Sequence, residues 1–188
     1  MFKSNKKGFT LIELLIVIGI ISILAGIVLV AVNPAVQFGK ANDSERKSEI
    51  GTILSAVYQY QTSPTARGQL PTCKVGDGTN APTVDQVIPT CDGAATGTFD
   101  GALQLGSATG LIDCRGALVP DYLNSVPFDP DNAYSASTTG YYICQQTDAA
   151  GVHRVYVLAP HAEVYTTDGG CKDPTDTTGN GDSMCVSG

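Results

Sequence analysis

The feature that most constrains the fold is an apolar run from Leu14 to Val32. The run contains no charged residue, and its only side-chain polar atom is the hydroxyl oxygen of Ser22. As a helix that rises about 1.5 Å per residue, it would be roughly 28 Å long, close to the hydrocarbon thickness of about 30 Å. A buried helix of a soluble domain would normally carry a polar stripe. The run therefore predicts one membrane-spanning helix.

The charges that flank this run predict its orientation. Lys3, Lys6 and Lys7 precede it with no acidic residue among them, whereas the basic residues that follow it are interleaved with acidic ones. Uncompensated positive charge favours the cytoplasmic side of a membrane. We therefore expect a cytoplasmic N-terminus, with the rest of the chain on the other side.

The six cysteines agree with this orientation, because all of them lie beyond the apolar run. They form no C-x-x-C pair, and no histidine has metal-site spacing to them, so the pattern predicts disulfides in an oxidising compartment. We predict that neighbours along the chain are paired: Cys73–Cys91, Cys114–Cys144 and Cys171–Cys185.

Composition divides the chain into four segments, namely a basic leader (1–8), the apolar helix (9–33), its amphipathic continuation (34–61) and a head (62–188). Pro34 lacks an amide proton and predicts a kink between the two helical halves. In the second half, an apolar stripe from Ile50 to Val57 has helical spacing. We expect the charged residues 45–49 to form the solvated face of that helix.

The head carries its best strand signals near its C-terminal end. The runs 141–146 and 152–159 are rich in β-formers and are separated by a turn-forming segment, which predicts a hairpin. Residues 163–166 are expected to add an edge strand, and residues 62–117 to form a disulfide-tethered loop that contains short strands. The predicted fold class is therefore α+β.

Several classes of function receive no support from the composition. The net charge is −7 and the head has no basic stripe, so we predict no nucleic-acid partner. The chain has two histidines and lacks G-x-S-x-G, H-E-x-x-H and P-loop motifs, so we predict no enzymatic activity and no catalytic residue.

Acidic residues in turn-forming segments raise one question about metals. Asp129 and Asp131 flank a proline, and Asp173, Asp176 and Asp182 lie in a Gly-rich tail. Oxygen ligands of this kind suit Ca²⁺, but the spacing does not match an EF-hand and the same residues form turns. We predict no cofactor and no metal, and keep the three tail aspartates as calcium candidates.

Glu13 conflicts with a simple anchor, because it lies at the start of the apolar run in K-K-G-F-T-L-I-E. A carboxylate moved into hydrocarbon costs a few kcal/mol and usually has a partner. A secretory signal peptide would have a shorter apolar core and a small-x-small cleavage site. A plain anchor fits the length of the run and leaves Glu13 unexplained.

The residues K-K-G-F-T-L-I-E-L-L-I-V-I resemble the N-terminus of type IV prepilins and their pseudopilin relatives. The resemblance implies cleavage between Gly8 and Phe9 by a prepilin peptidase, which would then methylate the new amine of Phe9. It also implies that Glu13 of one subunit pairs with the Phe9 amine of the next. A pilin-like lollipop fold is implied, with a long helix packed on a small antiparallel sheet and disulfide-stapled loops.

The resemblance further implies the partners and location of the protein. The precursor would be a single-pass inner-membrane protein in contact with lipid, and the processed subunit would join copies of itself in a helical filament outside the cytoplasm. An assembly platform and minor pilins would be further partners. The filament would be either a pilus at the cell surface or a periplasmic pseudopilus.

A weaker resemblance to members related to the major pseudopilin spans Leu118 to Pro130 and the following Tyr141-Tyr142 strand. Three functions consequently stay open besides an anchored enzyme. The first is a type IV pilin, which the six cysteines and the long loop favour. The second is a pseudopilin of a type II secretion system, and the third is a membrane-anchored binding domain that never assembles.

Overall fold

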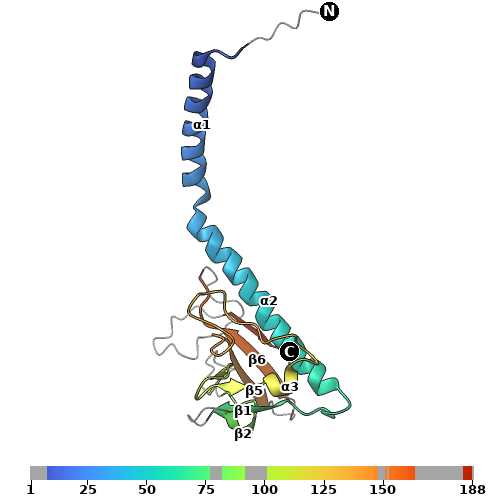
Figure 1. The fold of residues 1–188 in the computed structure, drawn as a ribbon. Coiled ribbons are helices and arrows are strands. Elements are labelled where there is room, and N and C mark those ends of the chain that lie inside the picture. The colour runs from blue at the N-terminus through green and yellow to red at the C-terminus, as the bar shows by residue number, and fades with distance from the viewer. Residues whose placement is uncertain are drawn as a thin grey trace, which may run out of the picture. The chain divides into compact units, whose positions relative to one another are not determined.

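The computed structural model describes residues 8–76, 82–91, 101–147, 151, 153–163 and 184–187. The chain divides into two compact units, Met1–Phe38 and Gly39–Gly188. The first unit contains helix α1, Leu11–Val32, and the beginning of helix α2, Pro34–Thr62. The second contains the rest of α2 and the sheets of the head (Figure 1).

Helix α1 begins after the N-cap Thr10 and ends before Asn33, which adopts a left-handed conformation with a φ of 42°. The next residue, Pro34, opens α2, where its missing amide proton is not needed. The kink predicted at Pro34 is thus confirmed, as a complete break between two helices. Within the described residues, α1 is the one helix long and apolar enough to cross a membrane, with a mean hydropathy of 3.2.

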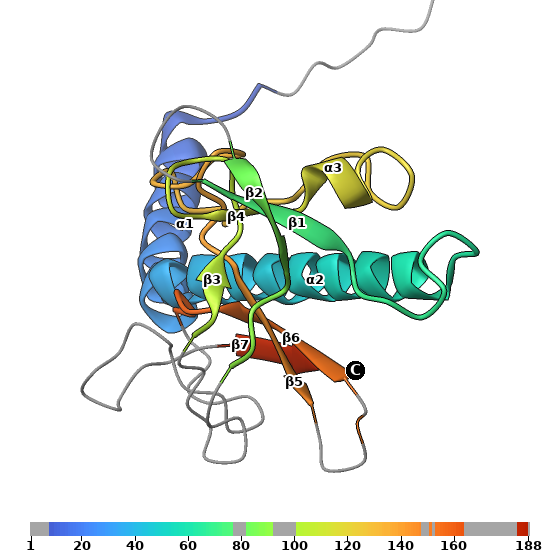
Figure 2. The same cartoon turned by 90° about the horizontal axis from the view of Figure 1, so that it is seen from below.

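The head contains two antiparallel sheets (Figure 2). One has the strand order β2-β1-β4, and the other has the order β3-β5-β6-β7. A short helix, α3, follows β4. The bounds are β1 Thr72–Gly76, β2 Pro82–Val87, β3 Leu103–Gln104, β4 Ile112–Asp113, α3 Arg115–Leu118, β5 Tyr142–Thr147, β6 His153–Ala159 and β7 Met184–Ser187.

The predicted hairpin is confirmed as β5 and β6, which pair from Tyr142 opposite Leu158 to Thr147 opposite His153. Strand β7 was not predicted, because a four-residue strand in a Gly- and Asp-rich tail is too short to show a period. Of the predicted edge strand 163–166, Glu163 lies in a bend, and the other three residues lie outside the described residues.

The apolar stripe of α2 is confirmed as the centre of the head core. Ile50, Ile53 and Val57 are fully or almost fully buried. They belong to one hydrophobic cluster that also contains residues of both sheets, including Ile112 and Ile143. Each such side chain contributes about 1.5–3 kcal/mol when it leaves water. This burial holds α2 and the two sheets together as one α+β unit.

The disulfides form, but the predicted pairing is wrong for the pairs that the structure describes. Cys73 bonds to Cys114 and Cys91 to Cys144, with Cα–Cα distances of 4.3 and 5.5 Å. Cys185 is also disulfide-bonded, while Cys171, its predicted partner, lies outside the described residues.

Strand pairing explains the correction. Lys74 of β1 lies opposite Asp113 of β4, which brings the preceding Cys73 next to Cys114. The amide of Cys91 donates to the carbonyl of Gln145 at 2.9 Å, beside Cys144. Long-range sheet topology, rather than distance along the chain, therefore selects the cysteine partners.

Candidate processing and assembly site

The segment that enters α1 is open to other molecules. Phe9 is 93% exposed. A Cβ atom built on Gly8 would meet no heavy atom of the described residues within 4 Å. The fold of this chain therefore does not itself require a glycine at position 8. A requirement for glycine there would have to come from a partner that binds this segment.

Glu13 has a bonding partner within its own chain. Its Oε2 atom accepts hydrogen bonds from the amide of Thr10 at 3.0 Å and from the hydroxyl of Thr10 at 2.7 Å. The Thr10 hydroxyl oxygen in turn accepts from the amide of Glu13 at 3.3 Å. This reciprocal arrangement is a capping box, which satisfies two amides at a helix N-terminus. The capping box was not predicted, although the spacing T-x-x-E is its recognised signature.

The capping box leaves part of the Glu13 carboxylate available. Both bonds from Thr10 end on Oε2, and Oε1 has no hydrogen-bond partner among the residues that the structure describes. One carboxylate offers about four acceptor sites. Glu13 can therefore keep its cap on α1 and accept a cationic group from another molecule at the same time.

The surface of α1 has no apolar covering in the single chain. All of its residues are exposed, and its large side chains from Leu11 to Val32 are about half exposed or more. Such a surface is stable in lipid or against other apolar helices, and not in water. The first unit therefore combines an exposed apolar helix with one carboxylate in the first turn of that helix.

The prediction that the charged residues 45–49 form a solvated face of α2 is wrong for Arg46, which is buried. Its side chain is only 1% exposed, because it is enclosed by carboxylates from three segments. Its Nε and one terminal nitrogen donate to the two oxygens of Asp129, both at 2.9 Å. Its other terminal nitrogen donates to Asp43 at 2.9 Å and to Glu163 at 3.2 Å. We call these four residues the Arg46 anchor.

The Arg46 anchor joins α2 to two loops of the head. The Asp43 carboxylate also accepts from the amide of Glu163 at 2.9 Å, and Asp129 also accepts from the amide of Asp131 at 3.0 Å. Burial alone lowers the pKa of Arg46, but the hydrogen bonds and charges of its carboxylate partners outweigh it and raise that pKa. The guanidinium consequently stays charged.

Asp129 is thereby used for structure, which argues against its role as a calcium ligand. The described residues contain no group of histidine, cysteine, aspartate and glutamate side chains that could hold a metal ion. The calcium candidates Asp173, Asp176 and Asp182 lie outside the described residues.

Glu49 of α2 lies beside the Arg46 anchor and accepts a short hydrogen bond from the hydroxyl of Tyr141. Burial is the main cause that raises the Glu49 pKa, and the nearby charges of Glu45 and Asp129 add to it. The Tyr141 bond and the charge of Arg46 oppose this shift without cancelling it. Ionisation of the Glu49 carboxyl group is therefore less favourable in the folded chain than in the unfolded chain.

A pH dependence follows from this shift. The Glu49 pKa is higher in the folded chain than in the unfolded chain. The contribution of Glu49 to the free energy of unfolding is therefore most favourable at a pH below its unfolded pKa, and it declines as the pH rises through its folded pKa. We expect Glu49→Gln, which can still accept from Tyr141, to raise the melting temperature by a few degrees at pH 7 and by less at pH 4. Circular dichroism of the full chain at both pH values measures this. An equal gain at both values, or a loss at pH 7 only, would contradict it.

Comparison with protein families gives a match to the prokaryotic N-terminal methylation motif over residues 3–29. This motif is the class III signal peptide of type IV pilins and pseudopilins, so the chain has the N-terminus of such a precursor. Together with the apolar helix α1, it indicates a membrane-anchored precursor. No curated protein and no solved structure matches the chain.

Proposed function

We propose that this chain is the structural subunit of a type IV filament and has no catalytic activity of its own. A prepilin peptidase would cut after Gly8 and methylate Phe9, and the processed subunit would polymerise through α1. The methylation motif over residues 3–29 is the observation that carries the proposal, because it implies both processing and assembly. The exposed Gly8–Phe9 segment is accessible to a peptidase, as this role requires.

The geometry at Glu13 supports a mechanism for assembly. Cleavage creates a charged amine on Phe9, and the free Oε1 of Glu13 on a neighbouring subunit can accept a hydrogen bond from it. Two opposite charges that are buried together cost far less than either charge alone. The uncleaved chain lacks this amine at Phe9. Assembly would therefore depend on cleavage, and the pairing would fix the axial register of packed α1 helices.

A pseudopilin of a type II secretion system is the second candidate, because the segment around V-P-F-D-P resembles such proteins. In the head this segment has a structural role, since Leu118, Leu123 and Val126 are buried and Asp129 binds Arg46. That role suits either kind of filament. Electron microscopy of sheared cell surfaces distinguishes the two, because a pilus extends from the cell and a pseudopilus stays in the periplasm.

The processing step gives the direct test of the proposed function. We expect the mature protein to begin at Phe9 and to carry one additional methyl group on its amine. Intact-mass measurement and N-terminal sequencing of protein from the native host read both changes. A mature chain that still begins at Met1, or that begins beyond Val32, would rule out processing of this kind.

A variant at Gly8 supplies the control for this experiment. Because the fold leaves open space there, Gly8→Arg should not disturb the folded chain. A displaced scissile bond can reduce a reaction rate by about 10²-fold, so this variant should keep its leader. Gly51→Arg is the matched control, since Gly51 also has open space around it and lies outside the methylation motif of residues 3–29. It should be processed normally.

A further inference from the structure

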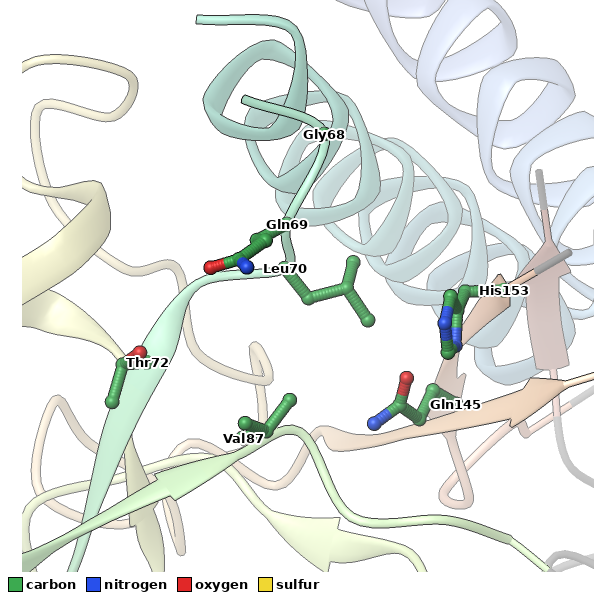
Figure 3. Close-up of a pocket in the computed structure, with 7 residues that line it drawn as sticks. All are labelled: Gly68, Gln69, Leu70, Thr72, Val87, Gln145 and His153. Atoms are coloured by element: carbon green, nitrogen blue, oxygen red, sulfur yellow. The ribbon is translucent and has the colours of Figure 1, made fainter. Parts of the chain in front are cut away.

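A pocket of about 310 Å³ lies in the head, far along the chain from the processing segment (Figure 3). One side comes from Gln69 and Leu70, which precede β1, and from the cross-strand pair of Thr72 in β1 and Val87 in β2. The other side comes from Gln145 and His153 of the β5–β6 hairpin. The pocket therefore lies between the two sheets, and its volume is at the lower end of the range for ligand sites.

Polar groups without partners line this pocket. Among the described residues, Gln145 Oε1 is the buried side-chain atom that has no hydrogen-bond partner. The Gln145 amide nitrogen donates to the carbonyl of Ile88 at 2.5 Å, and this contact fixes the direction of the oxygen. In Figure 3 the oxygen points toward the side of the pocket formed by Leu70 and His153. A buried acceptor without a donor is unfavourable, so this edge of the pocket holds a polar atom whose hydrogen-bonding capacity is unused.

Other polar side chains of the pocket are exposed to solvent and are not fully used in contacts with the described residues. His153 contacts Thr147 through Nδ1 at 3.0 Å, and its Nε2 has no partner within the described part of the chain. The side chains of Gln69 and Thr72 likewise have no partner there. Val87 adds an apolar surface that is 51% exposed, which is unusual for a large apolar side chain of the head.

Disulfides hold both walls of the pocket in place. Thr72 precedes Cys73, which bonds to Cys114. Gln145 follows Cys144, which bonds to Cys91. A site whose walls are fixed before binding loses less conformational freedom when a ligand enters. The pocket is therefore preorganised as well as polar.

We propose that this pocket binds a neutral saccharide of one or two rings. The lining residues that the structure describes carry amide, hydroxyl and imidazole groups, and none of them is a lysine, arginine, aspartate or glutamate. Such groups pair with neutral hydroxyl and acetamido groups, and they do not offset the burial of a charged ligand. Leu70 and Val87 can contact the apolar C–H face of a sugar ring. The proposal goes beyond filament assembly and does not depend on it.

The test uses the full chain in phosphatidylcholine nanodiscs, which contain no sugar headgroup. Saturation-transfer NMR with N,N′-diacetylchitobiose and cellobiose measures binding of neutral sugars, and glucuronate and glucosamine serve as charged probes. We expect a neutral sugar to bind in the millimolar range and the charged probes to bind at least about tenfold more weakly.

Variants locate the binding in the pocket. Val87→Arg places a charge at the exposed apolar wall and should weaken binding of the neutral sugar at least about tenfold. Phe128→Arg is the matched control, because Phe128 is a large apolar side chain of the head, 45% exposed, and does not line the pocket. It should leave binding unchanged. The absence of saturation transfer from either neutral sugar, or equal binding by both variants, would overturn the proposal.

Discussion

Replacement of Glu13 by alanine is expected to abolish filament formation while it leaves the head folded. In the proposed filament, the variant would bury the Phe9 amine without its counter-charge. The removal of one partner from a buried ion pair costs about 3–5 kcal/mol. A loss of this size at each subunit addition raises the critical concentration for assembly by roughly 10²- to 4 × 10³-fold. Sedimentation of sheared filaments, followed by immunoblotting, measures the assembled fraction.

A second substitution separates the charge of Glu13 from its capping role. Glu13→Gln can still accept from the amide of Thr10 and thus preserve the start of α1, but it has no charge to offer an amine. We expect it to fail in assembly as well. Glu45→Ala removes an exposed carboxylate from α2 and serves as the matched control, with normal assembly expected.

The mass of each Glu13 variant must be measured alongside assembly. A start at Phe9 would show that cleavage took place, so that the missing filaments reflect assembly alone. If Glu13→Gln assembled as well as the unmodified chain, the ion pair would play no part. A non-assembling anchored domain would show no difference between the Glu13 variants and the control at all.

The two N-terminal helices could be predicted from the sequence because their signals are local. The length of an apolar run, the proline that cannot continue a helix, and the spacing of Gly8, Phe9 and Glu13 all act within a few turns. The hairpin 142–159 was predictable for the same reason, since both strands and their connection are adjacent in the chain. Glu13 shows the limit even here, because its bonds to Thr10 were visible in the spacing and were overlooked.

The head could be predicted only in part, because its arrangement depends on contacts between distant segments. The disulfide partners follow from the pairing of β1 with β4, which no local pattern specifies. Strand β7 exists because β6 offers it an edge, and not because of its own sequence. Arg46 looked like a surface residue for the same reason, since Asp129 lies 83 residues further along the chain. A basic side chain on a helix is expected to be exposed to solvent only when no carboxylate from a distant segment pairs with it.

Arg46→Met is expected to destabilise the head strongly. The variant removes a buried guanidinium and breaks its ion pairs with the buried carboxylates of Asp43 and Asp129. Loss of one member of a buried ionic group costs about 3–5 kcal/mol. For a unit of this size, each kcal/mol lowers the melting temperature by about 2–4 °C, so a fall of roughly 6–20 °C is expected. Thermal unfolding followed by circular dichroism measures it.

Two further variants decide whether the geometry of the Arg46 anchor matters as well as its charge. Lys40→Met removes a positive charge from an exposed position on the same helix and should change the melting temperature by about 2 °C or less. Arg46→Lys keeps the charge, but an ammonium group cannot reproduce the paired bonds to both oxygens of Asp129. We expect Arg46→Lys to lose most of the stability that Arg46→Met loses. Stability equal to that of the unmodified chain would mean that charge alone holds α2 to these loops. A small effect of Arg46→Met would mean that the apolar stripe around Ile53 suffices without the anchor.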